Sequence, residues 1–228
     1  MVNSAIRAVQ DFLVNLYFER IHLYQLKYMT QRNKLGRVDN GEKAEALKKM
    51  DECLEETKKY VKENDLARWR HRLYRFNGKL SEYSGDYKKA VGYYKKSLKF
   101  WKSDPEVKAK GLSRNLELEG FLSSALIMSG DAEKGLKMAR KVYAKYENTP
   151  AGRRLKRNDY TTWAIWRTGV VLFVGRAFLE SEAKFGKKEI VDWLCEAEKF
   201  LNPPRKVKTW ADFQYRRDEI LSLKKRLK

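Results

Sequence analysis

The chain has 228 residues, of which 50 are Lys or Arg and 30 are Asp or Glu, so the formal net charge is +20 at pH 7. With only four prolines and thirteen glycines, the composition favours an all-helical protein, either one domain or an extended repeat array. A positive surplus of this size favours an anionic partner, which could be nucleic acid, an acidic protein segment or a membrane surface. The alternative is that the source organism has basic proteins in general.

Cysteine use and apolar runs argue against secretion and membrane insertion. Cys53 and Cys195 lie far apart on helical patterns, and we expect both to be reduced, small core residues. Four charged residues interrupt the apolar N-terminal stretch within its first 20 positions, so it predicts neither a signal peptide nor a membrane span. The apolar run 169–173 is too short to span a membrane. We therefore expect a cytoplasmic protein.

Two long helices open the chain. The first, at about 4–34, carries more than one apolar stripe, which is typical of a helix that packs against two neighbours. Asp39 and Glu42 have the spacing of a capping box at the start of the second helix, which continues to about residue 64. Its apolar face points inward in this prediction, and its other face carries solvated charge.

The segment 69–101 predicts one helical hairpin. Gly85 can end the first helix in a left-handed conformation, and Asp86 is a good N-cap for the second. The residues that define the pattern are Tyr74, Gly78, Tyr87, Ala90, Tyr94 and Leu98. Their order and spacing resemble the tetratricopeptide repeat. This resemblance implies a right-handed superhelix of stacked hairpins, and an irregular helical bundle is the competing architecture.

The second half of the chain continues the helical pattern. Gly130 and Asp131 repeat the Gly-Asp pair of the hairpin 69–101, and residues 148–159 form a basic connection whose last residue, Asp159, can cap the next helix. The segment 160–185 is the most apolar; residues 170–174 alone could be a strand, but the pattern extends well beyond strand length and favours a central helix. The predicted single domain, 1–228, has four irregular hairpins and a capping helix, at about 4–64, 66–102, 106–147, 160–202 and 210–227.

A row of cations gives the first candidate binding site. Arg68, Arg72, Arg75 and Lys79 follow one another in steps of four, three and four, which places them on one stripe of a helix. Like charges at this spacing repel by a few tenths of a kcal/mol per pair, so the stripe favours an anionic partner. The resemblance implies that Arg72, Arg75, Lys79, Glu82 and Tyr83 face a concave groove.

The predicted ligand of this groove is an acidic protein or peptide segment. Some members of the resembled family clamp the carboxylates of a C-terminal tail with basic residues at matching positions. Here the next hairpin has Gly120 and Ser124 at two of those positions, so such a clamp is only partly matched. A stripe that is solvated, or paired with acids elsewhere in the protein, is the structural alternative.

A second basic pattern lies in the connections between hairpins. It comprises Lys108, Lys110, Arg114, Arg153, Arg154, Lys156, Arg157, Arg205, Lys206 and Lys208. In a stack of hairpins these connections share one edge, which could follow the backbone of RNA or single-stranded DNA while aromatic side chains stack on bases. The alternative is that these cations only keep the protein soluble.

The sequence gives little support for catalysis. It has two histidines, and neither a Gly-rich phosphate loop, a nucleophile elbow nor a Cys/His metal spacing. Glu19 and His22 have the E-x-x-H spacing of di-iron bundles, but that chemistry needs a second copy. His71, between two arginines, is expected to be solvated. We predict a non-enzymatic binding or scaffold protein without catalytic residues, metal or cofactor; a scaffold subunit whose end helices pair with another copy is a third possibility.

Overall fold

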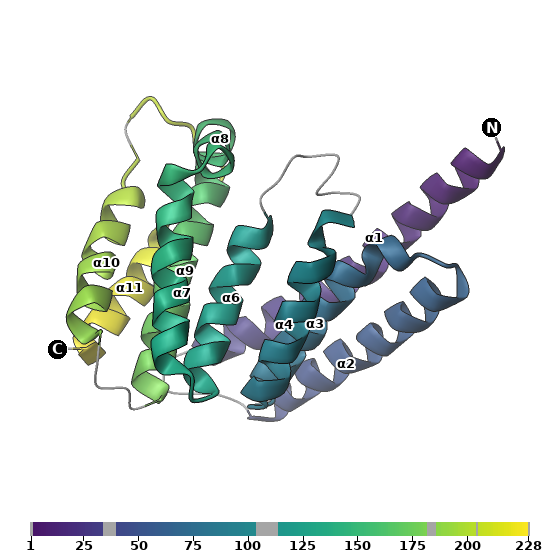
Figure 1. Cartoon of the computed structure of the whole chain (residues 1–228), viewed down its shortest axis with the longest axis horizontal. Helices are drawn as coiled ribbons and strands as arrows, with labels where there is room; N and C mark the ends of the chain where they lie inside the picture. Colours follow the sequence, from purple (N-terminus) through teal and green to yellow (C-terminus); the bar gives the residue numbers. More distant parts are fainter. Residues whose placement is uncertain (1, 34–39, 104–113, 182–185, 204, 228) are drawn as a thin grey trace. The chain divides into compact units, whose positions relative to one another are not determined.

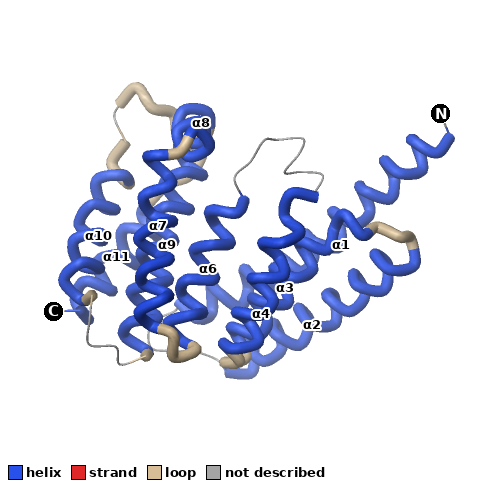
Figure 2. Tube along the Cα trace, in the orientation of Figure 1, coloured by secondary structure: helices blue, strands red, loops and turns tan. Residues whose placement is uncertain are grey.

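The computed structural model describes residues 2–33, 40–103, 114–181, 186–203 and 205–227. Within these ranges the regular structure consists of ten α-helices and two short 3-10 helices, with no strand (Figure 2). The prediction of an all-α protein is therefore confirmed. By its internal contacts the chain divides into two compact units, residues 1–105 and 106–228, where the sequence predicted one domain. The boundary falls between the predicted hairpins 66–102 and 106–147.

Unit 1 contains two helical hairpins (Figure 1). The first pairs α1 (Val2–Asn33) with α2 (Asn40–Glu63), and the second pairs α3 (Arg70–Tyr83) with α4 (Tyr87–Phe100). One 3-10 turn, η1 (Ala67–Trp69), precedes α3, and another, η2 (Trp101–Ser103), follows α4. The predicted hairpins 4–64 and 66–102 thus correspond closely to those in the structure.

Aromatic side chains join the two hairpins of unit 1. Phe18 on α1 is 1% exposed, and its ring lies 5.9 Å from that of Trp69 and 5.8 Å from that of Phe76. Val14 and Ile21 lie on the same side of α1 and are fully buried. Because these residues share one face of the helix, α1 packs on the rest of the unit through a single apolar stripe.

The hairpin α3–α4 is closed by local features that the sequence predicted. The side chain of Asp86 accepts a hydrogen bond from the amide of Lys89 at 3.0 Å, which caps α4. Gly85 has a φ of +80°, in the left-handed region that favours glycine. At Gly78, a Cβ atom would lie 2.4 Å from Cε1 of Tyr94. A side chain at position 78 would therefore force the two helices apart.

The prediction of a solvated His71 is wrong. The side chain is fully buried between α3 and α4, with Nδ1 3.1 Å from the carbonyl oxygen of Ser97 and 2.9 Å from its hydroxyl. The Ser97 hydroxyl also lies 2.8 Å from the His71 carbonyl oxygen, to which it can donate. The neighbouring arginines misled the prediction because adjacent helical residues point about 100° apart.

Unit 2 is organised around α9 (Tyr160–Glu180), which contacts each of the other helices described in this unit. These are α6 (Arg114–Met128), α7 (Ala132–Asn148), α8 (Pro150–Asn158), α10 (Lys187–Phe200) and α11 (Gln214–Leu227). Trp163, Val171 and Leu172 of α9 are fully buried. The preference for a central helix over a strand at 170–174 is confirmed.

Cys195 on α10 is exposed, against the prediction of a core residue, because Leu194 and Ala197 occupy the core-facing positions.

The predicted connection 148–159 is wrong, because most of it forms helix α8. Thr149 caps this helix by accepting a hydrogen bond from the amide of Gly152 at 3.1 Å, and Pro150 occupies a first-turn position where no amide proton is needed. Leu155 anchors α8 in the core. At Gly152 a Cβ would lie 2.4 Å from the carbonyl oxygen of Tyr146, so α8 lies tightly against the end of α7.

Candidate anion-binding surfaces

The cationic stripe of Arg68, Arg72, Arg75 and Lys79 faces α1 and the interior of unit 1 for much of its length. Arg68 donates to Oδ1 of Asp11 through Nη2 at 2.6 Å and Nε at 3.0 Å. Arg72 is 3% exposed and donates to the side chain of Asn15 at 2.9 Å. The guanidinium of Arg72 also lies 5.0 Å from the Trp69 ring centroid, a cation–π contact.

The far end of the stripe is also internal. The Lys79 side chain is 2% exposed and pairs with Glu82 at 3.1 Å. Glu82 accepts a second hydrogen bond from the Tyr94 hydroxyl at 2.6 Å. Burial, together with the nearby Glu82 carboxylate, raises the pKa of Tyr94 well above its usual value. Lys79 therefore neutralises an acid inside the protein.

The remaining predicted groove residues also contact their own unit. Tyr83 accepts a hydrogen bond from Gln25 at 3.2 Å and stacks on Tyr28 with 4.3 Å between ring centroids. Arg75 is half-buried, with its guanidinium 5.2 Å from the Phe76 ring centroid. The structure thus buries Arg72 and Lys79, two of the four cations of the stripe, and a partner in solution cannot reach their charges.

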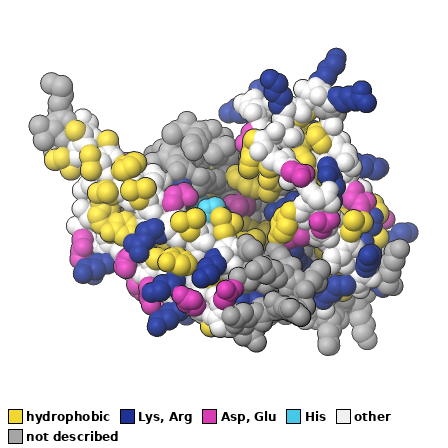
Figure 3. Space-filling model, turned by 180° about the vertical axis from the view of Figure 1, so that it is seen from behind, with side chains coloured by type: hydrophobic (Ala, Val, Ile, Leu, Met, Phe, Trp, Pro, Cys, Tyr) yellow, Lys and Arg dark blue, Asp and Glu magenta, His cyan; other side chains and the backbone are white. Residues whose placement is uncertain are grey.

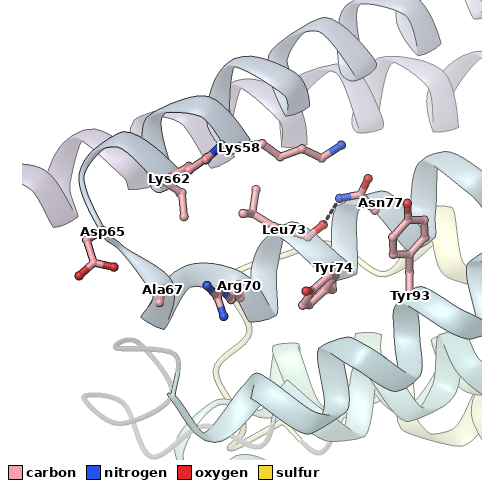
Figure 4. A pocket seen from close by; sticks show the side chains of 10 residues that line it. Lys58, Lys62, Asp65, Ala67, Arg70, Leu73, Tyr74, Asn77 and Tyr93 are labelled. Carbon is pink, nitrogen blue, oxygen red and sulfur yellow. Dashed lines mark hydrogen bonds between the residues drawn. The ribbon is translucent and has the colours of Figure 1, made fainter.

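Unit 1 has a different basic cavity, of about 480 Å³, between α2, α3 and the side of α4 (Figure 4). Lys58 and Lys62 come from α2, and Arg70 comes from the start of α3. Tyr74 and Tyr93 form the other wall, with 6.4 Å between their ring centroids in a stacked arrangement. Such a cavity can hold a planar ring against the tyrosines and a negative group near the cations.

This cavity was not predicted from the sequence, because the charged face of the second helix, which includes the cavity-lining lysines of α2, was expected to be solvated. The signal that was available is the spacing of Lys58 and Lys62, which places both on one side of α2. Lys58 is ion-paired with Glu55, whereas Asp65 is the single acidic residue among the residues that line the cavity.

Unit 2 gathers exposed cations at one end, called here the basic end. It consists of Arg153, Arg154, Lys156 and Arg157 on α8 and of Arg205, Lys206 and Lys208 in the connection after α10. Figure 3 shows Lys and Arg side chains protruding in the upper right of the view, where α8 and this connection lie. All seven except Lys156 are exposed.

Two hydrogen bonds from Trp210 attach the connection after α10 to the residues that follow α8. The backbone amide of Trp210 donates to Oγ1 of Thr161 at 3.1 Å, and its indole Nε1 donates to Oδ1 of Asp159 at 3.0 Å. Asp159 also caps α9, as predicted, by accepting from the amide of Thr162 at 3.0 Å. The connection after α10 is thereby attached at the junction of α8 and α9. The indole of Trp210 nevertheless stays 70% exposed beside the cations.

Few acids neutralise the basic end. Lys156 pairs with Glu147 at 3.0 Å, and Arg153 donates to the backbone oxygen of Glu147 at 3.4 Å. Lys156 is the one member of the seven that makes an ion pair within the described part of the chain. Glu147 in turn is held by Arg167, which is 3% exposed and also pairs with Glu196 at 3.1 Å.

The predicted basic edge is thus only partly described by the structure. Lys108 and Lys110 lie outside the described residues, as does the side chain of Arg114, whose backbone begins α6. The groups 153–157 and 205–208 are about 50 residues apart in sequence, and the link between their segments is Trp210, which bonds to Asp159 and Thr161 just after α8. The sequence anticipated the participating residues but not the helix that carries the first group.

Other kinds of site find little support in the described residues. Glu19 and His22 make a local 3.7 Å contact on an exposed face of α1. Over the described ranges, no three His, Cys, Asp or Glu side chains are grouped so that they could hold a metal ion, and no helix is long and apolar enough to cross a membrane. Comparisons with protein-family models, with curated proteins and with solved structures find no match to this chain.

Proposed function

We propose that this chain is a non-enzymatic binding module that holds RNA or single-stranded DNA at the basic end of unit 2. The observation that carries the proposal is the attachment of Trp210, in the connection with three exposed cations, to Asp159 and Thr161, just after the helix α8 with three more. The indole of Trp210 is 70% exposed at this attachment. Cations that follow a phosphate backbone, combined with an aromatic ring on which a base can stack, are the usual components of single-strand binding.

The chemistry of the basic end favours nucleic acid over an acidic peptide. Four of its seven cations are arginines, whose planar guanidinium groups can bind a phosphate through two parallel hydrogen bonds. An exposed indole adds stacking energy with a base of about 1–3 kcal/mol, and a carboxylate side chain has no ring to use it. The acidic-peptide alternative also loses support because Arg72 and Lys79 are buried.

The cavity of unit 1 offers similar chemistry at a separate place. Tyr74 and Tyr93 present stacked rings, and Lys96 holds its ammonium group 6.0 Å and 5.9 Å from their centroids. Lys62 and Arg70 line the same cavity and are exposed. A nucleotide with its base on the tyrosines and its phosphate near these cations fits this arrangement. We propose it as a secondary contact.

The relation to tetratricopeptide repeats is also a proposal. The approach of Tyr94 to Gly78 and the cap at Asp86 support it for the hairpin α3–α4. A right-handed superhelix, a role as a scaffold and a cytoplasmic location stay predictions from the sequence.

The direct test is a binding titration with a fluorescently labelled single-stranded RNA. Reversal of three charges, Arg153→Glu, Arg154→Glu and Arg205→Glu, should weaken binding at least tenfold. The matched control reverses three exposed lysines on α7 in the same unit, Lys134→Glu, Lys137→Glu and Lys141→Glu, and should change affinity less than about threefold. For the unaltered protein, log affinity should fall with log salt by about 0.7 per phosphate contacted.

Two results would contradict the proposal. One is an equal loss of affinity in the two triple variants, which would mean that only net charge matters. The other is salt-insensitive or absent binding of RNA by the unaltered protein. Displacement of the RNA by polyglutamate as effectively as by unlabelled RNA would favour the acidic-peptide reading instead.

A further inference from the structure

Helix α1 has a second apolar face, opposite the one that packs on unit 1. Val14, Phe18 and Ile21 occupy the inner face and are at most 1% exposed. The outer face exposes Ile6 (50%), Val9 (58%), Phe12 (63%), Leu13 (38%), Leu16 (47%), Leu23 (64%) and Leu26 (45%). Figure 3 shows hydrophobic side chains crowded along the N-terminal arm of α1, at the upper left.

This outer face is larger and more apolar than an end helix normally presents. Terminal helices of stacked hairpins usually have a polar outer side, which keeps them soluble. Seven side chains that are about half exposed offer on the order of 700 Å², whereas contiguous exposed patches above a few hundred Å² mark interaction sites. The face is therefore built to be covered by another apolar surface.

Five of the seven residues of the outer face have a spacing that reads the same in both directions; Phe12 and Leu13 lie outside this pattern. From Ile6 to Val9, Leu16, Leu23 and Leu26 the steps are three, seven, seven and three residues. If two copies of α1 pack antiparallel with Leu16 opposite Leu16, Val9 of each copy lies opposite Leu23 of the other. Ile6 comes level with Leu26 in the same way. A twofold interface needs such a self-complementary pattern, because the same surface serves both sides.

Charges distinguish the antiparallel arrangement from a parallel one. In a parallel pair, Arg20 would lie beside Arg20 and Lys27 beside Lys27, which brings like charges together along the seam. In the antiparallel pair centred on Leu16, Arg20 comes level with Phe12 of the other copy. Each cation also forms an ion pair with α2 of its own chain: Arg20 with Glu56 at 2.9 Å, and Lys27 with Glu45 at 3.9 Å.

We propose that the outer face of α1 is a dimer interface, with a second copy of this chain as its occupant, packed antiparallel about Leu16. The area on each copy approaches the ~800 Å² per partner of a standard protein interface. This interface lies on unit 1 and is independent of the basic end of unit 2. The dimer and the nucleic-acid site can therefore be tested separately.

The oligomeric state should be measured by sedimentation velocity or light scattering at protein concentrations of about 1–100 µM, which detects a dimer with a dissociation constant in or below this range. The unaltered chain, 27.0 kDa as a monomer, should form a dimer. Leu16→Glu places two carboxylates together on the twofold axis and should give a monomer with unchanged helicity. Leu221→Glu is the matched control, since Leu221 on α11 is 48% exposed, and this variant should remain a dimer.

Cysteine cross-linking fixes the direction of packing. In a Cys195→Ser background, which leaves only the buried Cys53, mild oxidation should cross-link Val9→Cys/Leu23→Cys chains to dimers. Val9→Cys alone should stay uncross-linked, because the two copies of position 9 are far apart in the antiparallel pair.

Three outcomes would overturn the proposal. The unaltered chain could stay monomeric up to about 100 µM, the dimer could survive Leu16→Glu, or Val9→Cys alone could cross-link efficiently. If the chain is monomeric and instead floats with phosphatidylserine vesicles in a Leu16-dependent way, the outer face binds lipid and the dimer proposal is wrong.

Discussion

The cationic stripe of unit 1 and the basic end of unit 2 both place Arg and Lys close together in the sequence, yet the structure buries much of one and exposes the other. The stripe lies beside acceptors such as Asp11 and Asn15 on α1 and Glu82 on α3 itself. The basic end lies on a short helix and a connection, with Glu147 as the acid that pairs with it. The spacing of cations on a helix therefore does not reveal which side becomes internal; the composition of the neighbouring helix decides it.

The largest expected effect is on the free energy of unfolding, and it tests whether the cationic stripe stabilises unit 1 from within. Lys79→Ala leaves Glu82, only 11% exposed, without its cation, and should lower the free energy of unfolding by about 3 kcal/mol. Arg154→Ala on the exposed basic end should change it by less than about 0.5 kcal/mol. Urea denaturation of both variants measures the difference.

A double variant sharpens this prediction. Lys79→Met combined with Glu82→Gln removes both charges and should recover more than half of the stability that Lys79→Met alone loses, as coupled partners do. Equal destabilisation by Lys79→Ala and Arg154→Ala would mean that the stripe is not internal.

The next effect concerns the role of the exposed indole. Trp210→Ala should weaken binding of single-stranded RNA by about tenfold, which corresponds to the loss of one stacked base. Binding of inorganic polyphosphate, which has no bases, should change less than about threefold. If both ligands lose affinity equally, Trp210 acts only by holding the connection in place. Trp210→Phe, which retains a ring, should restore part of the RNA affinity.

The smallest expected effect is on the stability contributed by Asp159, which binds Trp210 and so attaches the connection after α10. Burial opposes the charge of Asp159, but hydrogen bonds from Thr162 and Trp210 outweigh it and hold its pKa below the usual value. Because the pKa is lowered on folding, the stabilisation is complete above the unfolded pKa of about 3.9 and is lost as pH falls through the folded pKa.

Asp159→Asn should therefore lower the free energy of unfolding by about 1 kcal/mol at pH 7, the usual contribution of a helix cap. Below about pH 4 the stabilities of the variant and the unaltered protein should become more similar. Thermal unfolding at pH 7 and at pH 3 measures both quantities. A cost that is the same at both values would show that the carboxylate charge plays no part.

The sequence was sufficient for features that depend on neighbouring residues. The helix breaks at Gly85 and Gly130, the caps at Asp86 and Asp159 and the helical state of 170–174 follow from local periodicity and backbone preferences. Helix α8 was predicted as a connection although Thr149 and Pro150 form a recognisable helix start, because a helix of nine residues is too short to show a clear apolar periodicity.

Features that depend on distant residues were not predictable in the same way. The burial of His71 and Lys79 depends on which face of α3 meets α1 or α4, and no local pattern specifies that. The basic end was predicted as a set of residues along an edge, but its compact form depends on the bonds from Trp210 to Thr161 and Asp159. The cavity of unit 1 similarly forms only when α2, α3 and α4 are packed together.

The most direct test of the central claim is ultraviolet cross-linking of the protein to single-stranded RNA, followed by mass spectrometry of the cross-linked peptides. If the basic end holds the strand, cross-links should map to Trp210 and to residues 150–158 and 205–208, and the Arg153→Glu/Arg154→Glu/Arg205→Glu variant should lose them. Cross-links confined to the α1–α3 contact around Arg72, or none above the level of a heat-denatured control, would contradict it.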